Sequence, residues 1–151
     1  MTLTVQAPLA GTVIALEQVP DPVFAGRFVG TGAAIDPDRD KGEVTAVAPV
    51  SGTVAKVHPH AFVIASEDGR GVLVHLGLDT VGLKGQGFTV HVADGDEVSA
   101  GDAIVTWNPS DVADRGLSPV VPVITLEAAE EDVALAAKGS VAAGDGLLTW
   151  A

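Results

Sequence analysis

Two phrases of this 151-residue sequence occur twice, and this repetition constrains the fold more than any other feature. APLAGTV at residues 7–13 returns as APVSGTV at 48–54, and DEVSAGDAIVTW at 96–107 returns as GSVAAGDGLLTW at 139–150. The two offsets, 41 and 43 residues, are nearly the same. Paired repeats in one order predict two similar halves that share an antiparallel core, in a closed or nearly closed sheet.

Short runs rich in Val, Ile and Thr predict a domain made mainly of β-strands. The chain also holds 18 glycines and nine prolines, and turn signals such as Asp68-Gly69 lie between the runs. We therefore expect a single all-β domain over residues 1–151, an antiparallel β-sandwich or barrel-like fold with an internal pseudo-repeat. One or two short helices are expected, at Ser110–Arg115 and Ala128–Ala137. The expected strands are 12–16, 27–35, 53–57, 62–65, 71–76, 88–92, 104–107, 121–126 and 147–150.

Composition excludes several classes of function. No cysteine is present, which rules out a disulfide framework, a thiolate metal site and a cysteine nucleophile. Twenty acidic residues face eight basic ones, and the net charge of −12 disfavours nucleic acid and anionic membranes but steers a basic protein partner inward. We read no signal peptide, and no apolar run approaches the roughly 20 residues of a membrane span. We therefore expect a cytoplasmic protein without membrane insertion.

Histidine is the leading candidate for reactive chemistry, because the chain has four histidines but no cysteine or tyrosine. His75 lies in an apolar strand-like run, where a histidine is usually a satisfied core residue. Gly77 argues for a functional role, since a glycine in such a run indicates close approach of another group. Asp79 and Thr80 place a carboxylate and a hydroxyl just past the histidine.

A second histidine is predicted to lie beside the first. His60 leads the run that precedes His75, and Pro59 before it suits a strand entry or edge. A hairpin that turns near residues 67–70 would pair positions 60 and 75 across neighbouring strands, where opposed side chains lie about 4.5–5.5 Å apart. The spacing therefore predicts a two-histidine site.

The segment around His75 resembles a known family. GRGVLVHLGLDTV at residues 69–81 is similar to the signature around the phosphorylated histidine of the glucose-type enzyme IIA components (EIIA type 1) of the bacterial phosphoenolpyruvate-dependent sugar phosphotransferase system. Further phrases occur in the family's order and extend the resemblance to nearly the whole chain: PDPVFA at 20–25, VGTGAAIDP at 29–37, APVSGT at 48–53, HAF at 60–62, LKGQGF at 83–88 and GD at 101–102.

The resemblance implies that His75 is the phosphoryl acceptor and that His60 contacts the phosphoryl group. It implies a phosphotransferase component with a phosphohistidine intermediate, which takes phosphoryl from the carrier HPr and passes it to a cysteine of an enzyme IIB domain. The sugar taken up would be of the glucose or N-acetylglucosamine type. Such transfer needs mainly positioning, so two fixed imidazoles suffice without a metal or another cofactor.

The segment ahead of His60 departs from the family pattern. Members usually have a supporting threonine there, whereas this chain has His58 and Pro59, and we expect His58 to take over that support. Asp79 either orients His75 or repels phosphate, and the residues alone leave both roles open. The expected supporting residues are His58, Gly77, Asp79 and Thr80.

An apolar segment matches the docking surface of the family, and we expect HPr to bind there. The competing interpretation is that its aromatic residues belong to the core, as aromatic residues usually do. The chain has only four Phe, two Trp and no Tyr, however, and two Phe stand within this segment. The expected docking residues are Pro22, Val23, Phe24, Phe28 and Val29.

Two other classes of protein stay open. A biotinyl- or lipoyl-type carrier has similar APxxGT phrases, but its lysine stands in a Met-Lys-Met or Asp-Lys-Ala context that the lysines of this chain lack. A zinc hydrolase would need three imidazole ligands, which His58, His60 and His75 would supply, although their spacing matches no zincin motif.

Overall fold

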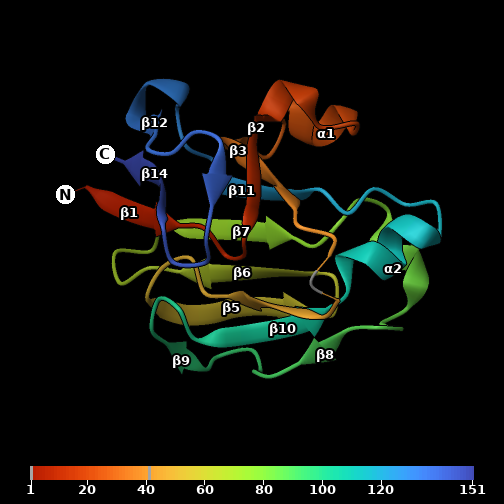
Figure 1. The fold of residues 1–151 in the computed structure, drawn as a ribbon. Helices are drawn as coiled ribbons and strands as arrows, with labels where there is room; N and C mark the ends of the chain where they lie inside the picture. The colour runs from red at the N-terminus through yellow and green to blue at the C-terminus, as the bar shows by residue number, and fades with distance from the viewer. Residues whose placement is uncertain (1, 41) are drawn as a thin grey trace.

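The computed structural model describes residues 2–40 and 42–151, which form an antiparallel β-sandwich with two short α-helices (Figure 1). Its strands are β1 (Leu3–Gln6), β2 (Gly11–Ala15), β3 (Gly30–Pro37), β4 (Val44–Val47), β5 (Gly52–His58), β6 (Ala61–Ala65), β7 (Gly71–His75), β8 (Thr89–Val90), β9 (Glu97–Val98), β10 (Ala103–Trp107), β11 (Val121–Leu126), β12 (Val133–Leu135), β13 (Ser140–Val141) and β14 (Gly146–Trp150). The helices are α1 (Pro22–Ala25) and α2 (Pro109–Asp114), with 3-10 turns η1 (Leu16–Gln18), η2 (Thr80–Leu83) and η3 (Glu130–Asp132).

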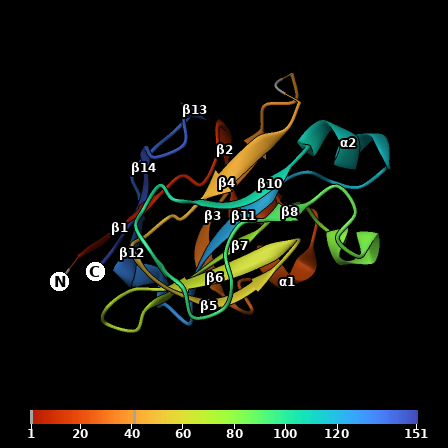
Figure 2. The ribbon, with the colours of Figure 1, turned by 90° about the horizontal axis from the view of Figure 1, so that it is seen from below.

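One large sheet and two small sheets make up the sandwich. The large sheet has the order β13-β2-β3-β11-β7-β6-β5-β9, and the small ones have the orders β1-β14-β12 and β4-β10-β8. The chain ends lie side by side, because Leu3 of β1 pairs with Trp150 of β14, and both views of the ribbon agree on this (Figures 1 and 2). No helix of the described part of the chain has the length and apolar character that crossing a membrane requires.

The sequence repeats correspond to equivalent strand pairs. Gly11 at the start of β2 pairs with Val141 of β13, and Gly52 at the start of β5 pairs with Val98 of β9. β14 pairs with β1 just as β10 pairs with β4. A Cβ added at Gly11 or Gly52 would lie 2.3 or 1.9 Å from a carbonyl oxygen of the next strand, so both halves need glycine for the same close backbone approach.

The two faces of the large sheet carry separate apolar clusters. Ala33 and Ile35 of β3 point into the main core between the sheets, whereas Ala34 points into a smaller cluster beneath α1 and η1. β7 alternates in the same way, with Val74 in the main core and Leu73 against the smaller cluster. Side chains alternate between faces along a strand, so this pattern places His75 on the face of the smaller cluster.

The sequence predictions of elements are confirmed in most places and wrong in some. The predicted strand 121–126 matches β11, and the helix expected at Ser110–Arg115 is α2, which begins at Pro109 and is capped by Asn108. The helix expected at Ala128–Ala137 is wrong: η3 and β12 lie there, and Val133 pairs with Trp150. Tertiary pairing overrides the helix propensity of an alanine-rich segment. Besides β12 and η3, the elements that the sequence did not predict are α1, β1, β4, β9, β13, η1 and η2.

Candidate active site around two histidines

His75 ends β7, and its ring is held by the backbone two residues later. Its Nδ1 lies 2.5 Å from the carbonyl oxygen of Gly77. A carbonyl oxygen only accepts hydrogen bonds, so Nδ1 carries the hydrogen and donates it. The lone pair of the neutral imidazole is therefore on Nε2, and the hydrogen bond fixes this tautomer.

The loop that follows His75 has the conformation that only glycine adopts easily at position 77. Gly77 has φ +81°, and a Cβ there would lie 2.7 Å from Cγ2 of Thr80 and 3.0 Å from the carbonyl oxygen of Ser118. The buried Thr80 hydroxyl donates to the carbonyl oxygen of Leu76 at 2.8 Å and closes the loop. Gly77 and Thr80 thus set the position of the carbonyl that binds His75.

His60 comes close to His75, with ring centroids 5.3 Å apart and planes at 70°. The strand register differs by one residue from our prediction, because Ala61 and not His60 pairs with His75. His60 lies in the turn between β5 and β6, and its carbonyl oxygen accepts from the backbone N–H of Leu76 at 2.7 Å. Since His60 lies outside the ladder, strand alternation does not dictate the direction of its side chain.

His58, at the end of β5, stacks on His60. Its ring centroid lies 5.7 Å from that of His60, with planes at 22°. Asp94 is near as well, and its pKa is lowered chiefly by the backbone N–H of Val57, then by Lys56 and least by His58. The structure therefore gives a row of three imidazoles, while the supporting role of His58 stays a prediction.

Both histidines of the pair favour the neutral form. Burial lowers the pKa of His75 below its ordinary value, and the Gly77 carbonyl, Asp21 and Asp79 oppose that shift only in part. The pKa of His60 is also lowered, first by burial and then by the neighbouring charges of His75 and His58. A neutral imidazole has a free lone pair, so the site holds a nucleophile near neutral pH.

The expected docking segment divides into a buried and an exposed part. The Asp21 side chain accepts from the backbone N–H of Val23 at 2.9 Å, which caps α1. Phe24 of α1 is 8% exposed and packs on His75, with 5.3 Å between ring centroids. Phe24 is thus buried against His75, as the core interpretation expects, while its part in docking stays a prediction. Phe28 is 78% exposed, Pro22 and Val23 are exposed, and Val29 is half-buried.

One exposed apolar residue near the site was missed. Val81 in η2 is 64% exposed and lies six residues past His75. Val81 stands inside the signature segment at residues 69–81, and this position was the sequence signal that could have identified it as a site residue. Within residues 2–40 and 42–151, no three His, Cys, Asp or Glu side chains form a group that could hold a metal ion.

Known proteins that are similar to this chain come from one family. Residues 3–131 match the family described as phosphoenolpyruvate-dependent sugar phosphotransferase system, EIIA 1. The chain is 43% identical over 124 residues to the PTS system glucose-specific EIIA component of Oceanobacillus iheyensis, covering 81% of this chain and 73% of that protein. The chain is also 48% identical over 122 residues to the PTS system glucose-specific EIIA component of Halalkalibacterium halodurans, covering 80% of this chain and 68% of that protein.

Two further relatives extend over nearly the whole chain. The glucose-specific EIICBA component of Streptococcus pneumoniae is 48% identical over 147 residues, which are 95% of this chain and 20% of that longer protein. The solved structure of glucose permease IIA from Mycoplasma capricolum superposes with a TM-score of 0.89 at 38% identity, covering 99% of this chain and 96% of the other.

Proposed function

Because the chain belongs to the EIIA 1 family of the phosphoenolpyruvate-dependent sugar phosphotransferase system, and so is a phosphocarrier in sugar uptake, we propose that His75 is its phosphoryl acceptor. The donor is phospho-HPr, and the recipient is a cysteine of an enzyme IIB domain. The observation that carries the assignment is the hydrogen bond from Nδ1 of His75 to Gly77, which leaves Nε2 as the nucleophile.

The transfer is an in-line displacement at phosphorus. The lone pair of Nε2 forms the new P–N bond, and the P–N bond to the donor histidine breaks, so that the donor ring leaves with its electron pair. Nδ1 of His75 keeps its hydrogen throughout, because the Gly77 carbonyl accepts it. The reverse geometry delivers the group onward, with a cysteine sulfur as the attacking atom.

His60 acts on the charge of the transferred group. Its ring lies 5.3 Å from that of His75, close enough to reach the oxygens of a phosphoryl group on Nε2. The dianion raises the pKa of a neighbouring imidazole, which then donates a charge-assisted hydrogen bond. His58 stacks on the opposite side of His60 and supports its orientation, in the place where the family usually has threonine.

The proposed docking surface consists of exposed apolar residues of α1, of the segment just after it and of η2. Val23 and Phe28 flank Phe24, which contacts His75, and Val81 lies on the loop that follows His75. The net charge of −12 steers a basic partner toward such a surface.

The names of the relatives indicate which sugar is taken up. Three of them are called glucose-specific, and we assign glucose as the sugar whose uptake this chain serves. A single domain over residues 1–151 and a cytoplasmic location complete the proposal and are supported by family membership.

Phosphorylation tests the proposal directly. The chain is incubated with enzyme I, HPr and phosphoenolpyruvate, and the phosphate is followed by mass spectrometry. We expect one acid-labile phosphoryl group in the wild type and none in His75→Ala or His75→Gln. His91→Ala is the matched control, because exposed His91 contacts Thr106, away from the pair, and it should label fully. Full labelling of both His75 variants would remove His75 from this role.

A further inference from the structure

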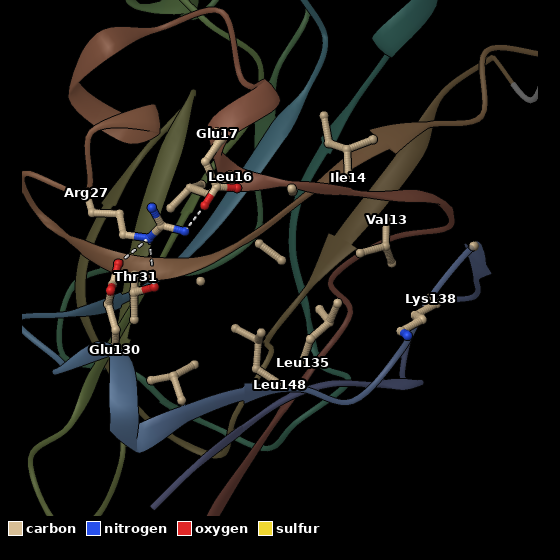
Figure 3. A pocket seen from close by; sticks show the side chains of 15 residues that line it. Val13, Ile14, Leu16, Glu17, Arg27, Thr31, Glu130, Leu135, Lys138 and Leu148 are labelled. Atoms are coloured by element: carbon tan, nitrogen blue, oxygen red, sulfur yellow. Dashed lines mark hydrogen bonds and ion pairs between the residues drawn. The ribbon is translucent and has the colours of Figure 1, made fainter.

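A pocket of about 430 Å³ lies between the large sheet and the small sheet that contains β12 and β14 (Figure 3). This volume falls within the roughly 300–1,000 Å³ typical of small-molecule sites. Thr31 and Ala33 of β3 line it, whereas Ala34 between Ala33 and Ile35 points to the opposite face, where Phe24 and His75 lie. Ile14 and Leu16 of the smaller cluster also line the pocket, but neither Phe24 nor His75 does, so the pocket is separate from the phosphoryl-transfer site.

The middle of the pocket is apolar. Val13 and Leu148 line it from opposite sheets, and Leu135 of β12 adds a third apolar side chain (Figure 3). Leu148 is buried, but Leu135 is 49% exposed in spite of its position on the pocket wall. A ligand with an apolar body would cover this side chain.

One end of the pocket carries a surplus of negative charge. The Arg27 guanidinium contacts the Glu17 carboxylate, and its Nε lies 2.8 Å from Oε1 of Glu130 and 3.3 Å from the hydroxyl of buried Thr31 (Figure 3). Two carboxylates face one guanidinium, so this end is net negative. Arg27 also has φ +58°, a left-handed conformation that residues with side chains rarely adopt and that is concentrated at functional sites.

The other end of the pocket carries a positive charge. Figure 3 shows the Lys138 side chain across the apolar middle from Arg27. Lys138 forms no ion pair with any residue that the structure describes. The pocket thus has a negative end, an apolar middle and an unpaired ammonium group.

We propose that this pocket binds a short zwitterionic peptide with apolar side chains. Its terminal ammonium group pairs with Glu17 and Glu130, its carboxylate pairs with Lys138, and its side chains cover Leu135 and Leu148. A fatty acid or a sugar phosphate offers no cation to the negative end, and an alkylamine offers no anion to Lys138. In a single amino acid both charged groups are attached to one carbon atom, so they cannot reach the two ends of the pocket at once.

Titration of the ¹⁵N-labelled protein with the dipeptide Leu-Leu tests the proposal. We expect amide shifts in β2, β3 and β12 and none at Gly77. N-acetyl-Leu-Leu and Leu-Leu amide, each lacking one charge, should bind about two- to fivefold more weakly, the effect of losing one exposed ion pair. The same loss is expected for Leu-Leu with Lys138→Gln or Glu130→Gln, while Lys56→Gln, whose partner is Asp94, is the matched control.

Three results would overturn the proposal. The first is the absence of shifts at millimolar Leu-Leu. The second is equal binding of the blocked and free peptides, which would make the pocket a purely apolar site. The third is shifts confined to the loop after His75. Because both charged variants change exposed side chains, their folding can be verified by the unchanged remainder of the spectrum.

Discussion

The ring of Phe24 packs against the ring of His75, with 5.3 Å between their centroids. The capped helix α1 brings Phe24 to this position from a distant part of the sequence. Burial is the main cause of the lowered pKa of His75, and Phe24 supplies part of that burial. A core residue thus helps to keep His75, the proposed acceptor, in its neutral form.

Replacing Phe24 should therefore affect both stability and titration. We expect Phe24→Ala to lower the free energy of unfolding by about 3 kcal/mol, as for other buried aromatic residues, and to raise the pKa of His75. Phe28→Ala is the control, because Phe28 is exposed, and it should change stability by less than about 0.5 kcal/mol. Urea denaturation and NMR titration measure the two effects. Equal stability of both variants would contradict the packing role of Phe24.

Gly77→Ala should disturb the carbonyl that fixes the tautomer of His75. The added Cβ meets Thr80 and the Ser118 carbonyl, and φ +81° is unfavourable for alanine, so we expect a loss of at least about 1 kcal/mol in stability and slower phosphorylation. Gly82→Ala in the same loop is the matched control, since nothing lies within 4 Å of its Cβ position. Quench-flow phosphorylation with phospho-HPr compares the rates, and a wild-type rate for Gly77→Ala would exclude the proposed tautomer control.

Stability should depend on pH through the two histidines. Their pKa values are lowered in the folded protein, so between the folded and the unfolded pKa the unfolded chain binds more protons. The resulting stability is present above the ordinary pKa of 6.5 and is lost as the pH falls through the folded-state pKa. We expect the urea concentration at the unfolding midpoint to decrease as the pH is lowered from about 7.5 to about 5, and we expect a smaller decrease in His75→Gln. An identical fall in His75→Gln would assign the effect to other groups.

Removing His58 should change the titration of His60. The pKa of His60 is lowered by burial first and by His75 and His58 next, and His58 contributes to both causes because it stacks on that ring. We expect His58→Ala to raise the pKa of His60 and to slow onward transfer, while His75 is still phosphorylated. NMR titration gives the pKa, with His91→Ala as the control. An unchanged pKa together with unchanged transfer would leave His58 without a supporting role.

Exposed apolar residues near the site should matter for docking alone. We expect Phe28→Ser and Val81→Ser to raise the HPr concentration needed for half-maximal transfer without loss of stability, and added salt to slow association by screening. Leu135→Ser is the matched control, because Leu135 is similarly exposed but lies in the pocket on the other face of the sheet. A larger effect of Leu135→Ser would place the docking surface elsewhere.

The sequence was sufficient for the fold class and for bringing the two histidines together. The repeats predicted two similar halves, and the hairpin length brought His60 near His75. The register error of one residue arose because a turn residue was counted as part of the ladder. The sequence left the burial of Phe24 open, since it depends on the packing of α1 against residues such as Val120 and Ile124 from much later in the chain. The unpaired charge of Lys138 has the same origin in tertiary structure.

The pairing of β1 with β14 has a consequence for how this unit can be joined to others. Both chain ends emerge at one corner, whereas β7 runs away from that corner and presents His75 at its far end (Figure 1). A tether attached at either end would leave the His75 end of the unit unobstructed. The unit could then move between a phosphoryl donor and a recipient while it stays attached. The Streptococcus pneumoniae EIICBA component is a longer relative, and the segment that matches this chain makes up 20% of it.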